Sequence, residues 1–316
     1  MKKIIVLAAV AAMLPVSLMA QTAPDGGLSP EVLSRISKGY TGTSYDKAVR
    51  NALAGSSVNV MATNAENASM IDTHFSDRVK TKGITDQKSS GRCWLFTGLN
   101  VLRAKMIEKY NLGSFTFSQN YLFFYDQLEK ANLFLQGVID TRKLPFDDRK
   151  VDWLFSNPLS DGGQFTGVSD LAMKYGLVPS EVMPETYSSN NTSQMALQLK
   201  TILRQGGLAL RAVYDASPAA SAKGKNAAAA EVKVNPELLK IKESVLTDVY
   251  RILSLCLGVP PASFEWSMYD SSDKLVSTEE YTPLSFYKKY VDEDLDGNYV
   301  MLMNDPTREY GKVYEI

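Results

Sequence analysis

The sequence predicts an α+β fold in which helices come first and strands follow. Apolar residues recur at helical spacing over much of residues 94–257, and after Gly258 the chain turns to strand-like runs. This order is typical of α+β proteins. With 316 residues, 45% of them hydrophobic and 22% charged, the chain has an ordinary globular composition and enough length for a sizeable core.

Residues 1–20 are typical of a secretory signal peptide. Two lysines precede an apolar run from Ile4 to Leu14, and Ala20-Gln21 offers a cleavage point. The run is shorter than the roughly 20 residues that a membrane-spanning helix needs. We therefore expect an exported protein, periplasmic or extracellular, with no membrane attachment once the signal is removed. The net charge of −1 gives no electrostatic reason to expect nucleic acid as a partner.

Residues 21–82 are expected to form an N-terminal arm. A helical pattern covers residues 30–54 with a break at 40–44, and residues 55–70, rich in Ser, Asn and Ala, have the composition of a loop or an extended arm. The main domain is expected over residues 83–316. Its predicted helices cover 94–110, a segment starting at Ser118, 148–156, 168–175, 192–205 and 236–257.

Two other parts of the main domain have a different character. Residues 215–230 form a low-complexity, alanine-rich insert, either a linker or a solvated helical extension. Strand-like runs are expected at residues 262–269, 299–303 and 311–314.

The segment from Gln87 to Trp94 is the strongest functional signal in the chain. Cys93 follows Gln87-Lys-Ser-Ser-Gly-Arg and precedes a predicted helix. A thiol attacks as its thiolate, which the partial positive charge of a helix N-terminus favours. The Cys93 N–H and the Gln87 side-chain amide can then both point at an oxyanion formed on the attacked carbonyl. Gly91 would let a substrate approach the backbone closely.

This segment resembles the active site of papain-like cysteine peptidases, specifically the bleomycin hydrolase and aminopeptidase C branch. Further stretches that resemble the branch lie at residues 117–124, 147–149, 161–165, 175–179 and 184–186. The resemblance covers roughly residues 33–316 and is densest between 79 and 186. It implies a papain-like cysteine proteinase fold with the helical lobe present and the β-rich lobe incomplete.

The resemblance also implies roles and partners. Cys93 would be the nucleophile, and Gln87 with the Cys93 N–H would form the oxyanion hole. Gly162, Gly163 and Trp94 would bind the substrate backbone. The implied activity is that of a cysteine peptidase, most naturally an aminopeptidase, acting on peptides without a metal or organic cofactor. Members form homo-oligomers, which suggests a hexamer here. They are often cytoplasmic, so an exported member would depart from that pattern.

Two expected catalytic residues have no counterpart in the sequence. The family uses a histidine and an asparagine downstream of the cysteine, but the only histidine is His74 and no Asn-Ser-Trp motif occurs. The simplest expectation is a chain that lacks the C-terminal part, as a fragment or incomplete gene product would. The alternative is a catalytically inactive papain-like interaction domain. A thiol redox protein is less favoured, because Cys93 has no neighbouring resolving cysteine and Cys256 lies in an apolar helical context.

Overall fold

The computed structural model describes residues 27–68, 70, 72–79, 81–222, 225–291, 294–299, 307–309 and 312. The chain divides into two compact units, Met1–Ser76 and Asp77–Ile316. The boundary expected from the sequence, after residue 82, lies a few residues downstream of this division. The expected signal peptide and most of the predicted strands at 299–303 and 311–314 lie outside the described residues.

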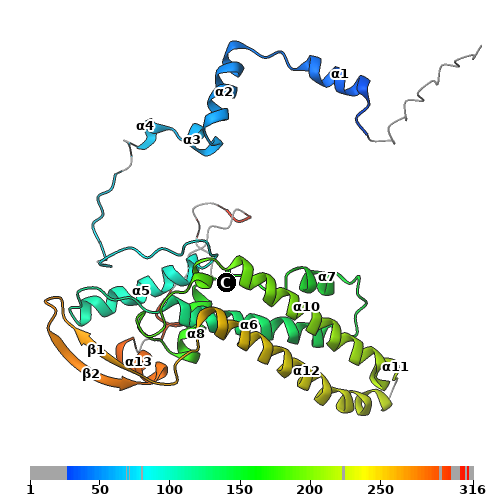
Figure 1. Cartoon of the computed structure of the whole chain (residues 1–316), viewed down its shortest axis with the longest axis vertical. Helices are drawn as coiled ribbons and strands as arrows, with labels where there is room; N and C mark the ends of the chain where they lie inside the picture. Colours follow the sequence, from blue (N-terminus) through cyan, green and yellow to red (C-terminus); the bar gives the residue numbers. More distant parts are fainter. Residues whose placement is uncertain are drawn as a thin grey trace, which may run out of the picture. The chain divides into compact units, whose positions relative to one another are not determined.

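The first unit consists of short capped helices in its described part (Figure 1). Helix α1 spans Pro30–Gly39 and α2 spans Ser44–Gly55, so the predicted break between two helices is confirmed. The expectation of a loop or an extended arm over residues 55–70 is wrong for the two stretches that form helices. Helices α3 (Val58–Ala62) and α4 (Ala65–Ala68) form there, and the Ser57 side chain caps α3 by accepting a hydrogen bond from the Val60 N–H.

The second unit is dominated by four long helices. These are α5 (Cys93–Lys109), α6 (Gln119–Asp140), α10 (Ser193–Ala216) and α12 (Lys225–Leu257). Helices α6, α10 and α12 pack along one another (Figure 1). The same unit contains the shorter helices α7 (Arg149–Ser156), α8 (Phe165–Tyr175), α9 (Tyr187–Asn190) and α11 (Pro218–Ser221).

The strands of the described residues form one antiparallel hairpin. Strand β1 (Phe264–Tyr269) pairs with β2 (Leu275–Tyr281), with Phe264 opposite Tyr281. Helix α13 (Pro283–Tyr290) follows β2, and a capping box at Thr282 starts it. The predicted strand at 262–269 is confirmed, whereas β2 and α13 were not predicted.

Several helices differ in length from their predictions. Helix α8 begins three residues before the predicted start at 168, and α10 continues well beyond the predicted end at 205. Gly206 and Gly207 do not end α10, because they lie where helices meet. A Cβ on Gly206 would stand 2.7 Å from Cγ2 of Val245. The end of the low-complexity insert belongs to α12, which also contains Pro236.

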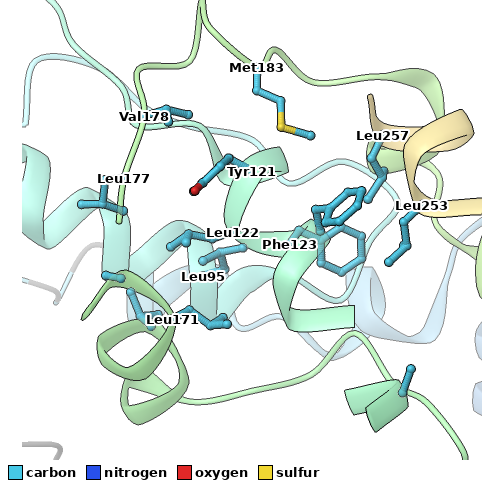
Figure 2. Close-up of a cluster of buried hydrophobic side chains, with 14 of the residues drawn as sticks. Leu95, Tyr121, Leu122, Phe123, Leu171, Leu177, Val178, Met183, Leu253 and Leu257 are labelled. Carbon is cyan, nitrogen blue, oxygen red and sulfur yellow. The ribbon is translucent and has the colours of Figure 1, made fainter. Parts of the chain in front are cut away.

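The core that holds α5 in place is drawn in Figure 2. Leu95 from α5 lies near Leu122 and Phe123 from α6 and Leu171 from α8. Leu95, Leu122 and Phe123 have no exposed surface. Burying a large apolar side chain stabilises a fold by roughly 1.5–3 kcal/mol, so these contacts fix the position of α5 firmly. Among the described residues, no helix combines the length and apolar character required to cross a membrane.

Candidate functional site

Cys93 is the first residue of α5 and its side chain is exposed. The predicted helix over residues 94–110 is therefore confirmed, and it begins one residue earlier, at Cys93 itself. The N-cap residue Arg92 offers no side-chain cap, and its carbonyl accepts hydrogen bonds from the Leu95 and Phe96 N–H groups, both at 3.0 Å. The N–H groups of Cys93 and Trp94 lie in the first turn of the helix, where backbone donors have no acceptor within the helix. This arrangement can bind a developing negative charge.

Gln87 closes the loop that leads to Cys93. Its Nε2 donates to the Ser90 carbonyl at 2.5 Å, and the Ser90 hydroxyl donates to the Gln87 carbonyl at 2.6 Å. A side-chain amide has two N–H donors, so the bond to Ser90 leaves one of them for another acceptor. The loop turns through Lys88, whose φ of 54° is left-handed. Gln87 and Cys93 thus belong to one folded loop, with the Gln87 amide held by the loop itself.

Arg92 anchors this loop from within the protein and has no exposed side-chain surface. Its two terminal nitrogens donate to the two carboxylate oxygens of Glu185 at 3.1 and 2.8 Å, and its Nε donates to the Ser90 hydroxyl oxygen at 2.9 Å. The guanidinium lies 5.0 Å from the ring centre of Phe96 and 5.1 Å from that of Phe123. Sequence reasoning missed this anchor, although residues 184–186 stood out as resembling the family.

The turn at Asp161 brings the predicted substrate-binding residues next to the cysteine loop. The Asp161 carboxylate accepts a hydrogen bond from the Gly91 N–H at 3.2 Å, and its carbonyl accepts one from the Trp94 indole N–H at 2.8 Å. A Cβ on Gly91 would stand 2.8 Å from that of Asp161. Gly91 was expected to admit a substrate, but the space beside it is filled by Asp161.

The two glycines of this turn have different surroundings. A Cβ on Gly163 would lie 2.6 Å from Cε2 of Trp94, whereas a Cβ on Gly162 would meet nothing within 4 Å. Trp94 is only 8% exposed, so its ring supports the turn from beneath. Gly162 therefore borders open space next to the segment that carries the exposed Cys93.

Lys130 holds the same turn from the other side. Its Nζ donates to the Gly162 carbonyl at 2.6 Å and the Ser160 carbonyl at 3.1 Å, and it forms an ion pair with Asp126 at 2.8 Å. It also lies 5.4 Å from the Trp94 ring centre. Burial raises the pKa of Asp126 to about 6, against the opposing attraction of Lys130. Neither Lys130 nor Asp126 was singled out from the sequence.

The other candidate residues belong to other segments of the chain. His74 belongs to the first unit, where its backbone N–H donates to the Asp72 carboxylate at 2.8 Å. Cys256 is a half-buried free thiol in α12. Within the described ranges, no group of three or more histidine, cysteine or acidic side chains is placed to hold a metal ion. A cavity of about 750 Å³, lined in part by Arg142 and Glu231, includes no residue of the cysteine loop.

Comparisons with known proteins agree on one family. The model of the Peptidase C1-like family matches residues 27–316. Aminopeptidase C of Lactobacillus delbrueckii subsp. lactis is 39% identical over 248 residues, which cover 78% of this chain and 52% of that protein. Aminopeptidase G of the same organism is 37% identical over 289 residues, covering 92% of this chain and 62% of that protein.

A solved structure matches as well. The crystal structure of PepW from Lactobacillus rhamnosis HN001 superposes with a TM-score of 0.73 at 33% identity, covering 86% of this chain and 58% of that chain. This likeness confirms the predicted papain-like α+β fold. The chain spans roughly half to three fifths of the length of the curated relatives that it matches.

Proposed function

Because this chain belongs to the Peptidase C1-like family, we propose that it carries the nucleophile of a cysteine aminopeptidase. The observation that supports this best is the exposed Cys93 at the first residue of α5, next to the turn that contains Gly162 and Gly163. The names of the similar aminopeptidases support peptides as the substrates.

The proposed reaction is acyl transfer through Cys93. The thiolate sulfur bonds to the carbonyl carbon of the first peptide bond, and the carbonyl oxygen takes up the negative charge. The Cys93 N–H and the second N–H of the Gln87 amide donate to that oxygen. The C–N bond then breaks as the leaving amine takes up the proton that the base had removed from the Cys93 thiol. Water hydrolyses the resulting thioester, which releases the N-terminal residue and restores the thiol.

The sequence of the unit that holds Cys93 contains no histidine, the residue type that the resemblance implies as the base. His74 is the only histidine in the sequence, and it lies in the first unit. We propose that a histidine outside these 316 residues takes the thiol proton in the active enzyme. A positioned base contributes about 10²–10⁴-fold to such a rate. The 316-residue chain should therefore hydrolyse aminoacyl amides about a thousandfold more slowly than a version extended with the histidine-bearing segment of a relative. Comparable rates would refute this assignment of the base.

The function is tested by labelling the nucleophile. The chain is treated with a dipeptidyl chloromethyl ketone that has a free amino terminus, and the modified cysteine is identified by mass mapping. Each labelling rate at Cys93 is divided by the rate of the same reagent with glutathione. After this correction, we expect the peptidyl reagent to label Cys93 faster than chloroacetamide does. The Cys93→Ala variant is the control. Absence of any preference for the peptidyl reagent would contradict a peptide-binding cysteine site.

The same experiment addresses a second candidate, a catalytically inactive interaction domain. The single histidine favours that reading. An inactive domain can retain the fold without selecting a peptidyl reagent at Cys93. Export and self-association as a hexamer also stay predictions, and cell fractionation and native mass measurements test them.

A further inference from the structure

We propose that Asp161 is a positioning residue that holds the loop before Cys93 and the Gly162–Gly163 turn at a fixed separation. The inference rests on the proposed function, because it concerns where a peptide lies relative to the nucleophile. Asp161 is not one of the proposed catalytic groups. Asp161 would act through the backbone of its neighbours, without touching the substrate.

Asp161 joins three segments that are far apart in the sequence. The same carboxylate oxygen, Oδ2, accepts two hydrogen bonds. One comes from the Gly91 N–H at 3.2 Å and the other from the Thr192 hydroxyl at 2.5 Å. The main-chain carbonyl of Asp161 accepts from the Trp94 indole at 2.8 Å. Gly91 and Trp94 flank Cys93 on both sides, and Thr192 is the N-cap residue of α10. The residue that begins the substrate-binding turn is thus bonded to both sides of the nucleophile.

Packing enforces the same separation. The close approach of Gly91 to Asp161 leaves no room for a Cβ on the glycine. On the other side of the turn, Gly163 lies against the Trp94 ring with equally little space. The two segments therefore cannot slide toward each other, and the hydrogen bonds of Asp161 prevent them from separating. Bonds to an ionised carboxylate are roughly twice as strong as those between neutral groups, which suits this restraining role.

The separation matters because the substrate must satisfy both segments at once. A peptide that lies along Gly162 reacts only if its carbonyl carbon stands about 3–3.5 Å from the sulfur, and a misplacement of about 1 Å can cost 10²-fold in rate. A small electrophile has no such requirement, because it reaches the exposed thiol without touching the turn. Loss of Asp161 should therefore slow peptidyl reagents selectively.

Three variants separate positioning from simple loss of stability. Asp161→Ala removes the carboxylate, Asp161→Asn keeps an oxygen that can accept from Gly91 and Thr192, and Thr192→Val removes one of the two donors. For each variant, the rates of Cys93 with the dipeptidyl chloromethyl ketone and with chloroacetamide are measured at one pH. Each rate is divided by the rate with glutathione, and the unfolding midpoint is recorded.

We expect the peptidyl rate of Asp161→Ala to fall about 10- to 100-fold, while its chloroacetamide rate changes less than about threefold. Asp161→Asn should keep the peptidyl rate within about fivefold of the native chain, and Thr192→Val should lose about 3- to 10-fold selectively. Should Asp161→Ala fail to fold, the last two variants decide. Two results would overturn the inference and leave the proposed function standing. One is an equal loss of rate with the peptidyl reagent and with chloroacetamide. The other is an unchanged preference for the peptidyl reagent in both Asp161→Ala and Thr192→Val. No peptidyl preference in the native chain would overturn the proposed function, and the inference with it.

Discussion

Arg92 and Glu185 lie 93 positions apart in the sequence, yet they form a two-pronged ion pair directly beneath the cysteine loop. The guanidinium has no exposed surface, while the carboxylate side chain is 27% exposed. The Ser189 hydroxyl donates to the same carboxylate at 2.7 Å. The residue before the candidate nucleophile is therefore fixed by charge, by hydrogen bonds and by the two aromatic rings beside it. This explains how an exposed loop can present Cys93 in one position.

Replacement of Glu185 should destabilise the protein, because it leaves the Arg92 charge buried without a partner. Breaking a buried ion pair costs about 3–5 kcal/mol, and the partial exposure of Glu185 places Glu185→Ala near the lower end of that range. Denaturant unfolding measures the loss. Lys88→Met is the matched control, because it breaks the exposed Lys88–Asp86 pair in the same loop, where about 0–1 kcal/mol is expected. Equal losses in the two variants would contradict the role of Arg92 as an anchor.

Gly163→Ala and Gly162→Ala should differ sharply, although the two glycines are neighbours. Neither has a left-handed backbone, so the surroundings decide the outcome. A methyl group on Gly163 collides with the buried Trp94 ring, and such overpacking costs typically about 1–3 kcal/mol. A methyl group on Gly162 enters open space, where a surface change stays within about 0.5 kcal/mol.

Unfolding free energies from denaturant titrations test this pair of variants. The reaction with the dipeptidyl chloromethyl ketone adds a second reading. Gly162→Ala should fold normally and still react more slowly with this reagent, because its methyl group occupies the space beside the turn. A Gly163→Ala variant as stable as the native chain would show that Trp94 can shift at no cost.

The helices were predictable where local signals sufficed. The apolar spacing after Cys93 placed both ends of α5 to within one residue, and the pattern over residues 148–156 did the same for α7. Ser118 marked the start of α6 to within one residue. Prediction failed where tertiary contacts override local preference. The pair Gly206-Gly207 resembles a helix end, but the missing side chains allow α10 to approach its neighbours closely. Strand β2 escaped notice because most of its residues are exposed and polar.

Only the part of the candidate site that is local in the sequence could be predicted. Gln87, Cys93 and Trp94 form a local string, and the string alone indicated a nucleophile at a helix start. Asp161 binds Gly91 across 70 positions, and Lys130 reaches the Gly162 carbonyl across 32. No spacing pattern marks such contacts, because the chain meets itself there only after folding.

Cys93 should react with chloroacetamide at least about tenfold faster than Cys256, since it is exposed at a helix N-terminus while Cys256 is half-buried in α12. The rate should rise with pH, because the thiolate is the reacting form. Mass mapping after limited alkylation of the folded chain measures both sites together. The same reaction in denaturant is the control, and there the two rates should converge. Faster labelling of Cys256 in the folded chain would count against Cys93 as the centre of the site.

Asp126 should give the stability of the protein a distinct pH dependence. Its pKa of about 6 is raised by burial above the ordinary value of 3.8, so the folded protein binds the proton more tightly than the unfolded chain does. The stabilisation from this group is complete below about pH 4, and it is lost as the pH rises through about 6. The shift corresponds to about 3 kcal/mol between these limits.

The Asp126→Asn variant, whose side chain cannot ionise, tests this. From pH 4 to pH 7, its unfolding free energy should rise relative to that of the native chain by up to this amount. Denaturant titrations at several pH values measure the difference, and Asp86→Asn, an exposed carboxylate whose pKa is instead lowered by Lys88, is the control that should show no such gain. A constant difference between Asp126→Asn and the native chain across this range would mean that the buried carboxylate titrates normally.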